Sequence, residues 1–399
     1  MRKVIKDFIL NLFIVLTKWR LGLNGSNVAK AKPKNILVVR LDEIGDAVLN
    51  VPFLRGLRKL YPAARITLVV KSAVVNIMEL SPYVDRVIAY PLYRGRGEFL
   101  VNLYRIIRFN SQLERFDLAI APRWDSDWAY RAGLIVLGSG ALRRVDYESR
   151  VYPAKAALDS AFDACYTDFV PSRAGGVHEV VRGLDIVRYL GGKSLADSLE
   201  LWWSDADFAR AKELLGVKEE GAVRVAVALS AGGGKRIWPR ERFGQVLKSL
   251  SEMDKYEFVF TGGDKHSYEA ADFLQKKYPE LRIINLVGKT TLRESAAALS
   301  LCDLYLGGDT GLMHIAVAVD IKGIAISCCP QDIKNIYNAN NPVRFGPYSK
   351  QFKILQPMTG EAGCENGCIK DYPHCILRIG VDEVVQAVTA AAAEVRHDN

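Results

Sequence analysis

Residues 40–46 read RLDEIGD and combine one arginine, three carboxylates and a glycine directly after a short apolar segment. We call this segment the aspartate turn. Gly45 suits a tight backbone position between a strand and a helix. Asp46 would then lie near the carboxyl end of a strand, where α/β sheets bind their ligands. Asp46 is therefore a candidate general base, and a helix-capping aspartate is the alternative.

A second candidate segment, the glycine turn, covers residues 230–236 and reads SAGGGKR. Its glycines allow backbone N–H groups to approach phosphate oxygens, and the helix that follows adds a positive dipole end. Lys235 and Arg236 supply charge, so the turn could hold a diphosphate without a metal. A flexible loop with a basic rim is the alternative.

A third candidate, the Asp-Thr-Gly turn, covers residues 308–314 and reads GDTGLMH. Thr310, Gly311 and the first helical N–H groups would form a second phosphate cradle. Asp309 could accept hydrogen bonds from sugar hydroxyls. His314 lies one turn into the helix and could face the same ligand, although a lone helical histidine is more often structural.

Other motifs carry less information. Residues 123–127 read RWDSD, and the Asp125-Ser126-Asp127 spacing binds divalent metal in some glycosyltransferases, but polar and aromatic groups at a strand end suit a sugar acceptor equally well. Residues 288–291 imitate part of a nucleotide-triphosphate loop, yet Ile283 stands where that motif needs its first glycine. No strand is followed by Gly-x-Gly-x-x-Gly, so a nicotinamide enzyme has weak support.

The seven cysteines are an odd number in a chain of large domains, which argues against a secreted disulfide framework and favours a reducing compartment. Cys364, Cys368 and Cys375, with His374 adjacent, have spacing that hints at a metal site. Because paired Cys-x2-Cys spacing is absent, the sequence favours reduced thiols in a loop over a structural zinc.

The predicted elements that hold these residues are apolar strands that alternate with helices along the chain. Strands are predicted at 35–40, 65–70, 87–90 and 117–121, and again at 223–229, 258–260, 304–306 and 323–327. This rhythm predicts two doubly wound α/β domains with a boundary near 190–205. A final Ala-rich helix is predicted over 381–395. The strand ends of two such facing domains would border one cleft.

The N-terminal segment is basic and apolar. The net charge is +9, and residues 1–34 hold eight basic residues and one acid, which accounts for +7 of it. A whole-surface nucleic-acid footprint is therefore not expected. Residues 8–16 are apolar apart from Asn11, and basic residues flank them. We predict an amphipathic helix at a membrane surface; a helix packed on the protein itself, or a dimer contact, is the alternative.

Taken together, the aspartate turn, the glycine turn with its following Trp238-Pro239, and the Asp-Thr-Gly-x-Met-His segment resemble the heptosyltransferase family, glycosyltransferase family nine. The resemblance covers residues 35–388. It implies a GT-B fold: residues 1–30 as membrane-surface segment and linker, 31–195 as a Rossmann-like acceptor domain, and 200–399 as a Rossmann-like nucleotide-sugar domain. It also implies an inverting transferase that needs no metal or other cofactor.

The resemblance assigns roles to individual residues. Asp46 is similar to the family's proposed base, and either Lys235 or Arg236 would stabilise the diphosphate leaving group. The implied donor-binding residues are Ser230, Gly232, Lys235, Arg236, Asp264, Thr290, Asp309, Thr310, Gly311 and His314. The implied acceptor-side residues are Arg40, Gly45, Arg123, Asp125 and Asp127. No residue is assigned as a metal ligand.

The resemblance implies a nucleotide sugar such as ADP-heptose as donor and a lipopolysaccharide or other lipid-linked acceptor. The enzyme would be cytoplasmic and peripheral on the inner face of the bacterial inner membrane, held there by residues 1–20. Asp42-Glu43 replaces a serine-containing turn of the family, which leaves both sugar and acceptor open. A GT-B nucleotide-sugar epimerase, or a non-catalytic sugar-nucleotide-binding protein at the membrane, are the alternatives.

Overall fold

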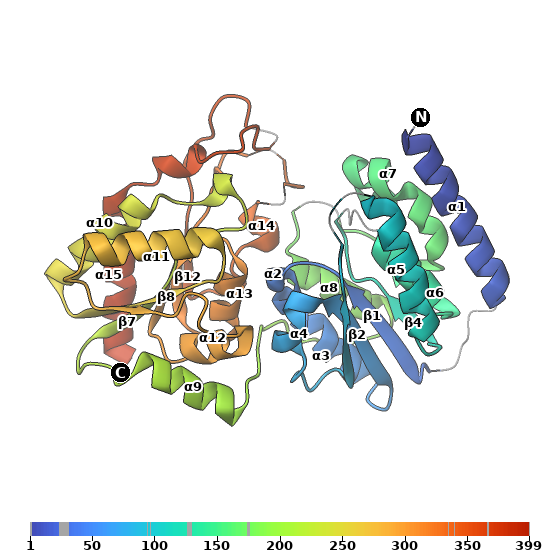
Figure 1. The fold of residues 1–399 in the computed structure, drawn as a ribbon, viewed down its shortest axis with the longest axis horizontal. Helices are drawn as coiled ribbons and strands as arrows, with labels where there is room; N and C mark the ends of the chain where they lie inside the picture. The colour runs from blue at the N-terminus through green and yellow to red at the C-terminus, as the bar shows by residue number, and fades with distance from the viewer. Residues whose placement is uncertain are drawn as a thin grey trace. The chain divides into compact units, whose positions relative to one another are not determined.

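The computed structural model describes residues 2–23, 32–93, 95, 97–125, 130–173, 176–333, 335–338, 340–364 and 367–398. The chain forms two compact units: Met1–Ala174 with Glu179–Asp197, and Gly175–His178 with Ser198–Asn399. Residues 175–178 thus belong to the second unit, residues 179–197 belong to the first again, and from Ser198 the chain stays in the second. Figure 1 shows the two units and their element labels.

The first unit is built on a six-stranded parallel sheet with the order β3-β2-β1-β4-β5-β6. Its strands are β1 (Asn35–Arg40), β2 (Arg65–Lys71), β3 (Arg86–Tyr90), β4 (Leu118–Ile120), β5 (Arg143–Asp146) and β6 (Asp168–Phe169). Its helices are α1 (Arg2–Leu21), α2 (Ile44–Leu49), α3 (Val51–Leu60), α4 (Ser72–Met78), α5 (Glu98–Gln112), α6 (Tyr130–Gly138), α7 (Pro153–Asp159) and α8 (Glu179–Tyr189).

The second unit has a second six-stranded parallel sheet with the order β12-β11-β10-β7-β8-β9. Its strands are β7 (Val223–Ala228), β8 (Tyr256–Thr261), β9 (Ile283–Asn285), β10 (Leu304–Gly308), β11 (Lys322–Ile326) and β12 (Phe352–Leu355). Its helices are α9 (Asp205–Leu215), α10 (Arg240–Met253), α11 (Lys265–Lys277), α12 (Leu292–Leu299), α13 (Gly311–Ala318), α14 (Pro342–Phe345) and α15 (Val381–Asp398).

Both sheets are covered on both faces, which explains why their central strands read as continuous apolar runs. In β1, Leu37 and Val39 pack into a core cluster that α1, α5 and α6 share, while Ile36 and Val38 on the opposite face are also buried. In β7, the alternating valines pack against α10, α11 and α15. Full burial of such branched side chains stabilises each sheet by roughly 1.5–3 kcal/mol per residue.

The two sheets have the same connectivity. Counted from its own first strand, each follows the order 3-2-1-4-5-6 of the doubly wound fold. The strand order therefore reverses between β1 and β4 in the first unit and between β7 and β10 in the second. Ligands of such sheets bind at these switch points, beyond the carboxyl ends of the strands.

Helix α1 is built into the first unit instead of forming a separate segment. Leu10 and Ile14 are buried in the core cluster that includes β1, and Figure 1 shows α1 beside α6. The opposite face of α1 is exposed and apolar. The predicted helix exists, and one of its faces packs on the protein, as the alternative interpretation expected. No helix among the described residues is both long and apolar enough to span a bilayer.

Several details differ from the sequence-based expectation. The single helix expected after the aspartate turn is two helices, because the chain breaks at Asn50 and α3 begins with Pro52 in its first turn. The short strands β5, β6, β9 and β12 were not predicted, since they are two to four residues long and mostly lack an apolar run. The last helix extends three residues beyond its predicted end.

Candidate active site

The two switch points gather most of the predicted site residues. Arg40 ends β1 and leads into the aspartate turn, while Arg123 and Asp125 follow β4, its neighbour in the sheet. In the second unit the glycine turn follows β7 and the Asp-Thr-Gly turn follows β10, again on adjacent strands. Asp127 lies outside the described residues. The strand order thus explains why residues far apart in sequence share an edge of each sheet.

Asp46 occupies the first turn of α2. One carboxylate oxygen, Oδ2, accepts a hydrogen bond from the Glu43 N–H at 3.2 Å, which forms a capping box, and Oδ1 lies 3.5 Å from the Arg40 guanidinium. The side chain keeps 24% of its surface exposed. Asp46 therefore caps its helix and still presents an accessible carboxylate, so the catalytic and capping interpretations are compatible.

The surroundings of Asp46 raise its pKa above the ordinary value. Burial is the largest cause, and the nearby carboxylates of Glu179 and Glu43 raise it further, whereas Arg40 and the Glu43 N–H lower it. A raised pKa makes the ionised carboxylate a stronger proton acceptor. Glu179, buried on α8, was not predicted as part of this site, because nothing in the local sequence relates the start of α8 to the aspartate turn.

Asp42 differs from its neighbour Glu43 in its surroundings. Its buried carboxylate lies 2.6 Å from Arg40 Nε and forms an ion pair with Arg123. Arg40 also donates to the Pro122 carbonyl. This network ties the ends of β1 and β4 together. Glu43 is exposed and pairs with Lys71. Asp42 thus links Arg40 to Arg123 and positions the aspartate turn. Its carboxylate is occupied by these two arginines and is not available to bind an acceptor.

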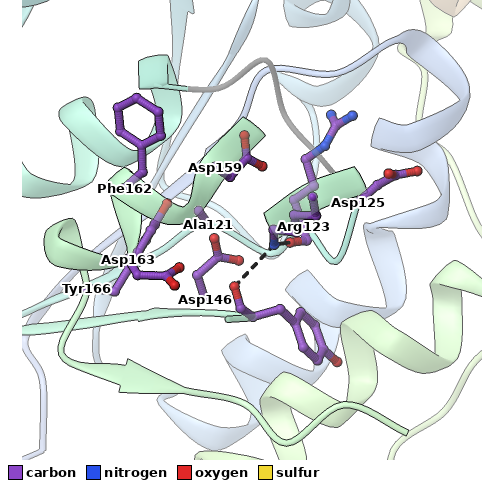
Figure 2. Close-up of a pocket in the computed structure, with 10 residues that line it drawn as sticks. Ala121, Arg123, Asp125, Asp146, Asp159, Phe162, Asp163 and Tyr166 are labelled. Carbon is purple, nitrogen blue, oxygen red and sulfur yellow. Dashed lines mark hydrogen bonds between the residues drawn. The ribbon is translucent and has the colours of Figure 1, made fainter. Parts of the chain in front are cut away.

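A small polar cavity lies beyond the end of β4 (Figure 2). Asp146, Asp159 and Asp163 line one side of it, and Asp125 and the guanidinium of Arg123 lie on the other. Asp125 accepts a hydrogen bond from the Tyr152 hydroxyl, and the Tyr152 ring stacks on Trp124.

Lys155 also lines this cavity. Its Nζ donates to the backbone carbonyls of Arg123 (3.2 Å) and Tyr147 (3.1 Å). Burial raises the pKa of Asp146 to about 7, and Lys155 limits the rise. Hydrogen bonds from Lys155 and Tyr152 therefore hold the Arg123–Asp125 segment in place beside several charged side chains. A segment that positions a polar ligand needs such fixed support.

The glycine turn is connected to β8 through a serine-aspartate network. Asp264 caps α11 by accepting the Ser267 N–H at 3.0 Å, and it also accepts the Ser230 hydroxyl at 2.5 Å. Burial raises the pKa of Asp264, but these hydrogen bonds lower it more, so its net pKa is below the ordinary value. Asp264 is an ionised acceptor. Ser267 was not predicted, although a serine three residues after a capping aspartate was a visible signal.

Arg236 is anchored across the glycine turn. Its guanidinium donates to the Gly232 carbonyl at 2.6 Å and lies 3.9 Å from Asp309 of the Asp-Thr-Gly turn. A side chain at Gly232 would bring Cβ within 2.4 Å of that guanidinium and would displace it from this position. Gly233 has a φ of +147°, a value that other residues rarely adopt. The turn thus holds one cation in a defined place, and Lys235 beside it is half-buried.

The Asp-Thr-Gly turn opens α13. Thr310 is its N-cap and accepts the Met313 N–H at 3.4 Å, which leaves earlier N–H groups of the first turn facing outward. His314 is only 4% exposed, and burial, together with His178, lowers its pKa to about 3. The imidazole is therefore neutral. Among the described residues its Nδ1 has no hydrogen-bond partner.

Thr290 is less open to a ligand. Its hydroxyl lies 2.8 Å from Ser295 Oγ, within the turn where Thr291 caps α12. Gly288 precedes it with a φ of +67°, and an added Cβ would collide with the Tyr268 hydroxyl. The turn is rigid, and the Thr290 hydroxyl is already engaged inside it.

Comparison with known proteins supports one enzyme class. The chain resembles a glycosyltransferase family 9 structure from Veillonella parvula (TM-score 0.72, 20% identity, covering 92% of this chain and 100% of that one). It also resembles Escherichia coli ADP-heptose lps heptosyltransferase II (TM-score 0.68, 18% identity, covering 90% and 99%). These likenesses confirm the GT-B fold.

Sequence comparison identifies the family. The family model of glycosyltransferase family 9 (heptosyltransferase) matches residues 161–369, just over half of the chain. Lipopolysaccharide heptosyltransferase 3 of Escherichia coli is 24% identical over 304 residues, covering 75% of this chain and 85% of that protein. Lipooligosaccharide heptosyltransferase 2 of Haemophilus influenzae is 24% identical over 344 residues, covering 82% and 90%. Fold and family together define a glycosyltransferase of the GT-B class. The chain belongs to glycosyltransferase family 9, as its turns predict.

Proposed function

We propose that this enzyme transfers a sugar from a nucleotide diphosphate sugar to a lipopolysaccharide or other lipid-linked acceptor, with inversion and without a metal. ADP-heptose is the first donor to test, because relatives are named as lipopolysaccharide and lipooligosaccharide heptosyltransferases and a structural neighbour is an ADP-heptose enzyme. The observation that carries the proposal is the accessible, pKa-raised carboxylate of Asp46 at the first switch point.

The reaction is a single displacement. Asp46 takes the proton of an acceptor hydroxyl while that oxygen forms a bond to the anomeric carbon. The bond between the anomeric carbon and the diphosphate oxygen breaks on the opposite face, which inverts the configuration. The nucleoside diphosphate leaves with the electron pair. Arg236 and the N-terminus of α13 supply positive charge where that negative charge develops.

The remaining donor groups suit the other parts of a nucleotide sugar. The carboxylate oxygens of Asp264 and Asp309 can receive hydrogen bonds from sugar hydroxyls. The neutral imidazole of His314 can hydrogen bond without ionising, since its Nδ1 has no partner among the described side chains. In this proposal the first unit binds the acceptor through Arg40, Gly45, Arg123 and Asp125, and the second binds the donor.

The donor is testable by thermal stabilisation of the full chain with ADP-, UDP-, GDP- and dTDP-sugars in a buffer without added metal, with NAD as control. We expect selective stabilisation by one nucleotide sugar, about 2.7 kcal/mol at 100 times its dissociation constant. Transfer to a lipid-linked acceptor with release of the nucleoside diphosphate should follow. Stabilisation by NAD alone would contradict the proposal.

Analysis of the reaction products separates the alternative functions. An epimerase would convert the donor when no acceptor is present, and a product chromatogram would reveal the new sugar. A non-catalytic binding protein would be stabilised by the donor yet release no nucleoside diphosphate with any acceptor.

We also propose that α1 holds the enzyme at the cytoplasmic face of the bacterial inner membrane. Its outward face exposes Phe8 (67%), Leu12, Val15, Leu16 and Trp19 (74%), all at helical spacing, and Lys18 and Arg20 lie at its carboxyl end. Such an apolar face with basic ends suits an anionic bilayer interface. Deletion of the helix would remove Leu10 and Ile14 from the core, so point variants are the better test.

The double variant Phe8→Ser with Trp19→Ser should co-sediment with anionic phospholipid vesicles at least about tenfold less than the wild type, because two large apolar contacts with the bilayer are lost. Its thermal stability should be unchanged. Val217→Ser with Met253→Ser, which removes exposed apolar side chains from the second unit, is the matched control. Unchanged sedimentation of the α1 variant would refute the membrane role.

A further inference from the structure

Three thiols and one imidazole lie close together in the loop before α15, and none of them is used in the proposed transfer reaction. Cys364, His374 and Cys375 are buried, and one ligand atom of each lies within 4.8 Å of the others. Cys368 lies outside this mutual set, but its Sγ is 3.5 Å from His374 Nε2, so it is the nearest candidate for a fourth ligand. The four residues line a small cavity together with Cys328 and Cys329.

Two sulfur–nitrogen distances in this cluster match those between ligands of one tetrahedral ion. With Zn–S near 2.3 Å and Zn–N near 2.0–2.1 Å, tetrahedral geometry places sulfur and nitrogen ligands about 3.6 Å apart. Cys364 Sγ lies 3.3 Å from His374 Nε2, and Cys368 Sγ lies 3.5 Å from it. Both distances are close to the separation that a shared metal requires.

The orientation of His374 supports the same interpretation. Its Nδ1 lies 2.9 Å from the Tyr372 carbonyl, which can only accept, so the proton is on Nδ1 and the lone pair of Nε2 points at the thiols. Histidine ligands of metals are held in this way by a carbonyl behind the ring. Cys375 Sγ accepts the Glu361 N–H at 3.3 Å, a bond that stabilises a thiolate.

We propose that Cys364, Cys368, His374 and Cys375 bind one structural Zn²⁺ ion. Three thiolates and one imidazole form a closed tetrahedral set with no open position, which is the pattern of structural zinc rather than of catalytic zinc. Binding releases the thiol protons to solvent. The ion is therefore separate from the sugar-transfer chemistry, which the proposed mechanism assigns to Asp46 and Arg236.

The position of this loop indicates what the ion stabilises. The backbone carbonyl of Asp371, between the second and third ligands, lies 3.1 Å from the point where a Cβ of Gly234 would stand. The loop thus packs directly against the glycine turn. Just beyond it, the Leu377 and Ile379 carbonyls accept hydrogen bonds from Arg242, and Ile379 also accepts one from Trp238. The ion would hold the loop of residues 364–375 in one conformation and thereby stabilise the glycine turn that packs against it.

The first test is elemental analysis of the full chain, purified under reducing conditions without added metal or chelator. We expect about one equivalent of zinc per chain. Exchange with Co²⁺ should produce thiolate-to-cobalt charge-transfer absorption and the visible bands of a tetrahedral site. A chain that holds no metal and takes up neither Zn²⁺ nor Co²⁺ would overturn the proposal. Stoichiometric iron with no zinc would overturn the assignment to zinc.

Variants locate the site. Cys364→Ser and His374→Ala should each lose most of the bound metal, whereas Cys302→Ser, at another buried cysteine of the same unit, should keep it. Loss from Cys302→Ser with retention in Cys364→Ser would contradict the assignment. If the ligand variants fail to fold, the cobalt spectrum of the wild-type chain still decides the case. A Cys364–Cys375 disulfide that persists under reducing conditions would also contradict the proposal.

Discussion

Replacing Asp46 with asparagine should lower kcat about 10²–10⁴-fold, the range that a positioned general base contributes. The amide keeps the size of the carboxylate and an oxygen that can accept the Glu43 N–H, so the cap of α2 can persist. What it loses is the capacity to take a proton from the acceptor hydroxyl. Steady-state kinetics of sugar transfer, with donor affinity measured separately, check this result.

The matched control is Asp207→Asn. Asp207 occupies the same capping-box position in α9, where it accepts the Ser204 N–H at 2.8 Å, and it lies outside the proposed site. This substitution should reduce stability modestly and leave kcat unchanged. If Asp46→Asn retains full activity, Asp46 is not the base. If both variants lose activity equally, the effect comes from capping rather than from proton transfer.

The pH profile gives a second readout of Asp46. The base acts only when ionised, so activity is lost as the pH falls through its pKa. Because burial and neighbouring carboxylates raise that pKa, the acidic limb of kcat/KM should lie above the ordinary aspartate range near 3.9. Replacing Glu179 with glutamine removes one of the charges that raise it and should move this limb to lower pH.

Replacing Arg236 with glutamine should lower kcat about 10²–10³-fold, which is the typical effect of removing one preorganised charge-stabilising donor. Its guanidinium is already held by the Gly232 carbonyl and lies beside Asp309, so it needs little reorganisation to meet a leaving diphosphate. Arg236→Lys keeps the charge but loses the planar fork, and we expect an intermediate loss of about tenfold.

Comparison of two variants decides which cation matters most. Lys235→Gln should reduce activity less than Arg236→Gln, because among the described residues no hydrogen bond holds the Lys235 ammonium in place as the Gly232 carbonyl holds the Arg236 guanidinium. Arg240→Gln, an exposed arginine on the following helix, serves as the control for loss of one positive charge. A larger effect at Lys235 than at Arg236 would transfer the leaving-group role to the lysine.

The central architecture was predictable because it rests on local patterns. Strands such as β1 and β7 are buried on both faces and read as unbroken apolar runs, and each is followed by a turn rich in glycine or carboxylates. The edge strands were not predictable. β9 and β12 are short and half-buried, so their sequences carry neither a continuous run nor a clear alternation.

Side-chain surroundings were harder to predict than elements. The pairing of Asp42 with Arg123 depends on β1 and β4 being neighbours in the sheet, which no local spacing reveals. The burial of His314 follows from the packing of α13. Apolar side chains lie on two opposite faces of α1. The sequence therefore does not show which of these faces packs into the core, and the structure shows that it is the face with Leu10 and Ile14.

The repeated strand order of the two sheets has an evolutionary consequence. Each unit closes its own core around the same topology, as expected if a single ancestral module was duplicated and its copies then diverged. The aspartate turn belongs to one copy, and the glycine turn and the Asp-Thr-Gly turn belong to the other. If the first copy binds the acceptor and the second the donor, as we propose, substitutions that adapt the first copy to a new glycan leave nucleotide recognition intact. A lineage can diversify its surface polysaccharides by altering one half of the gene while the other half stays under constant selection.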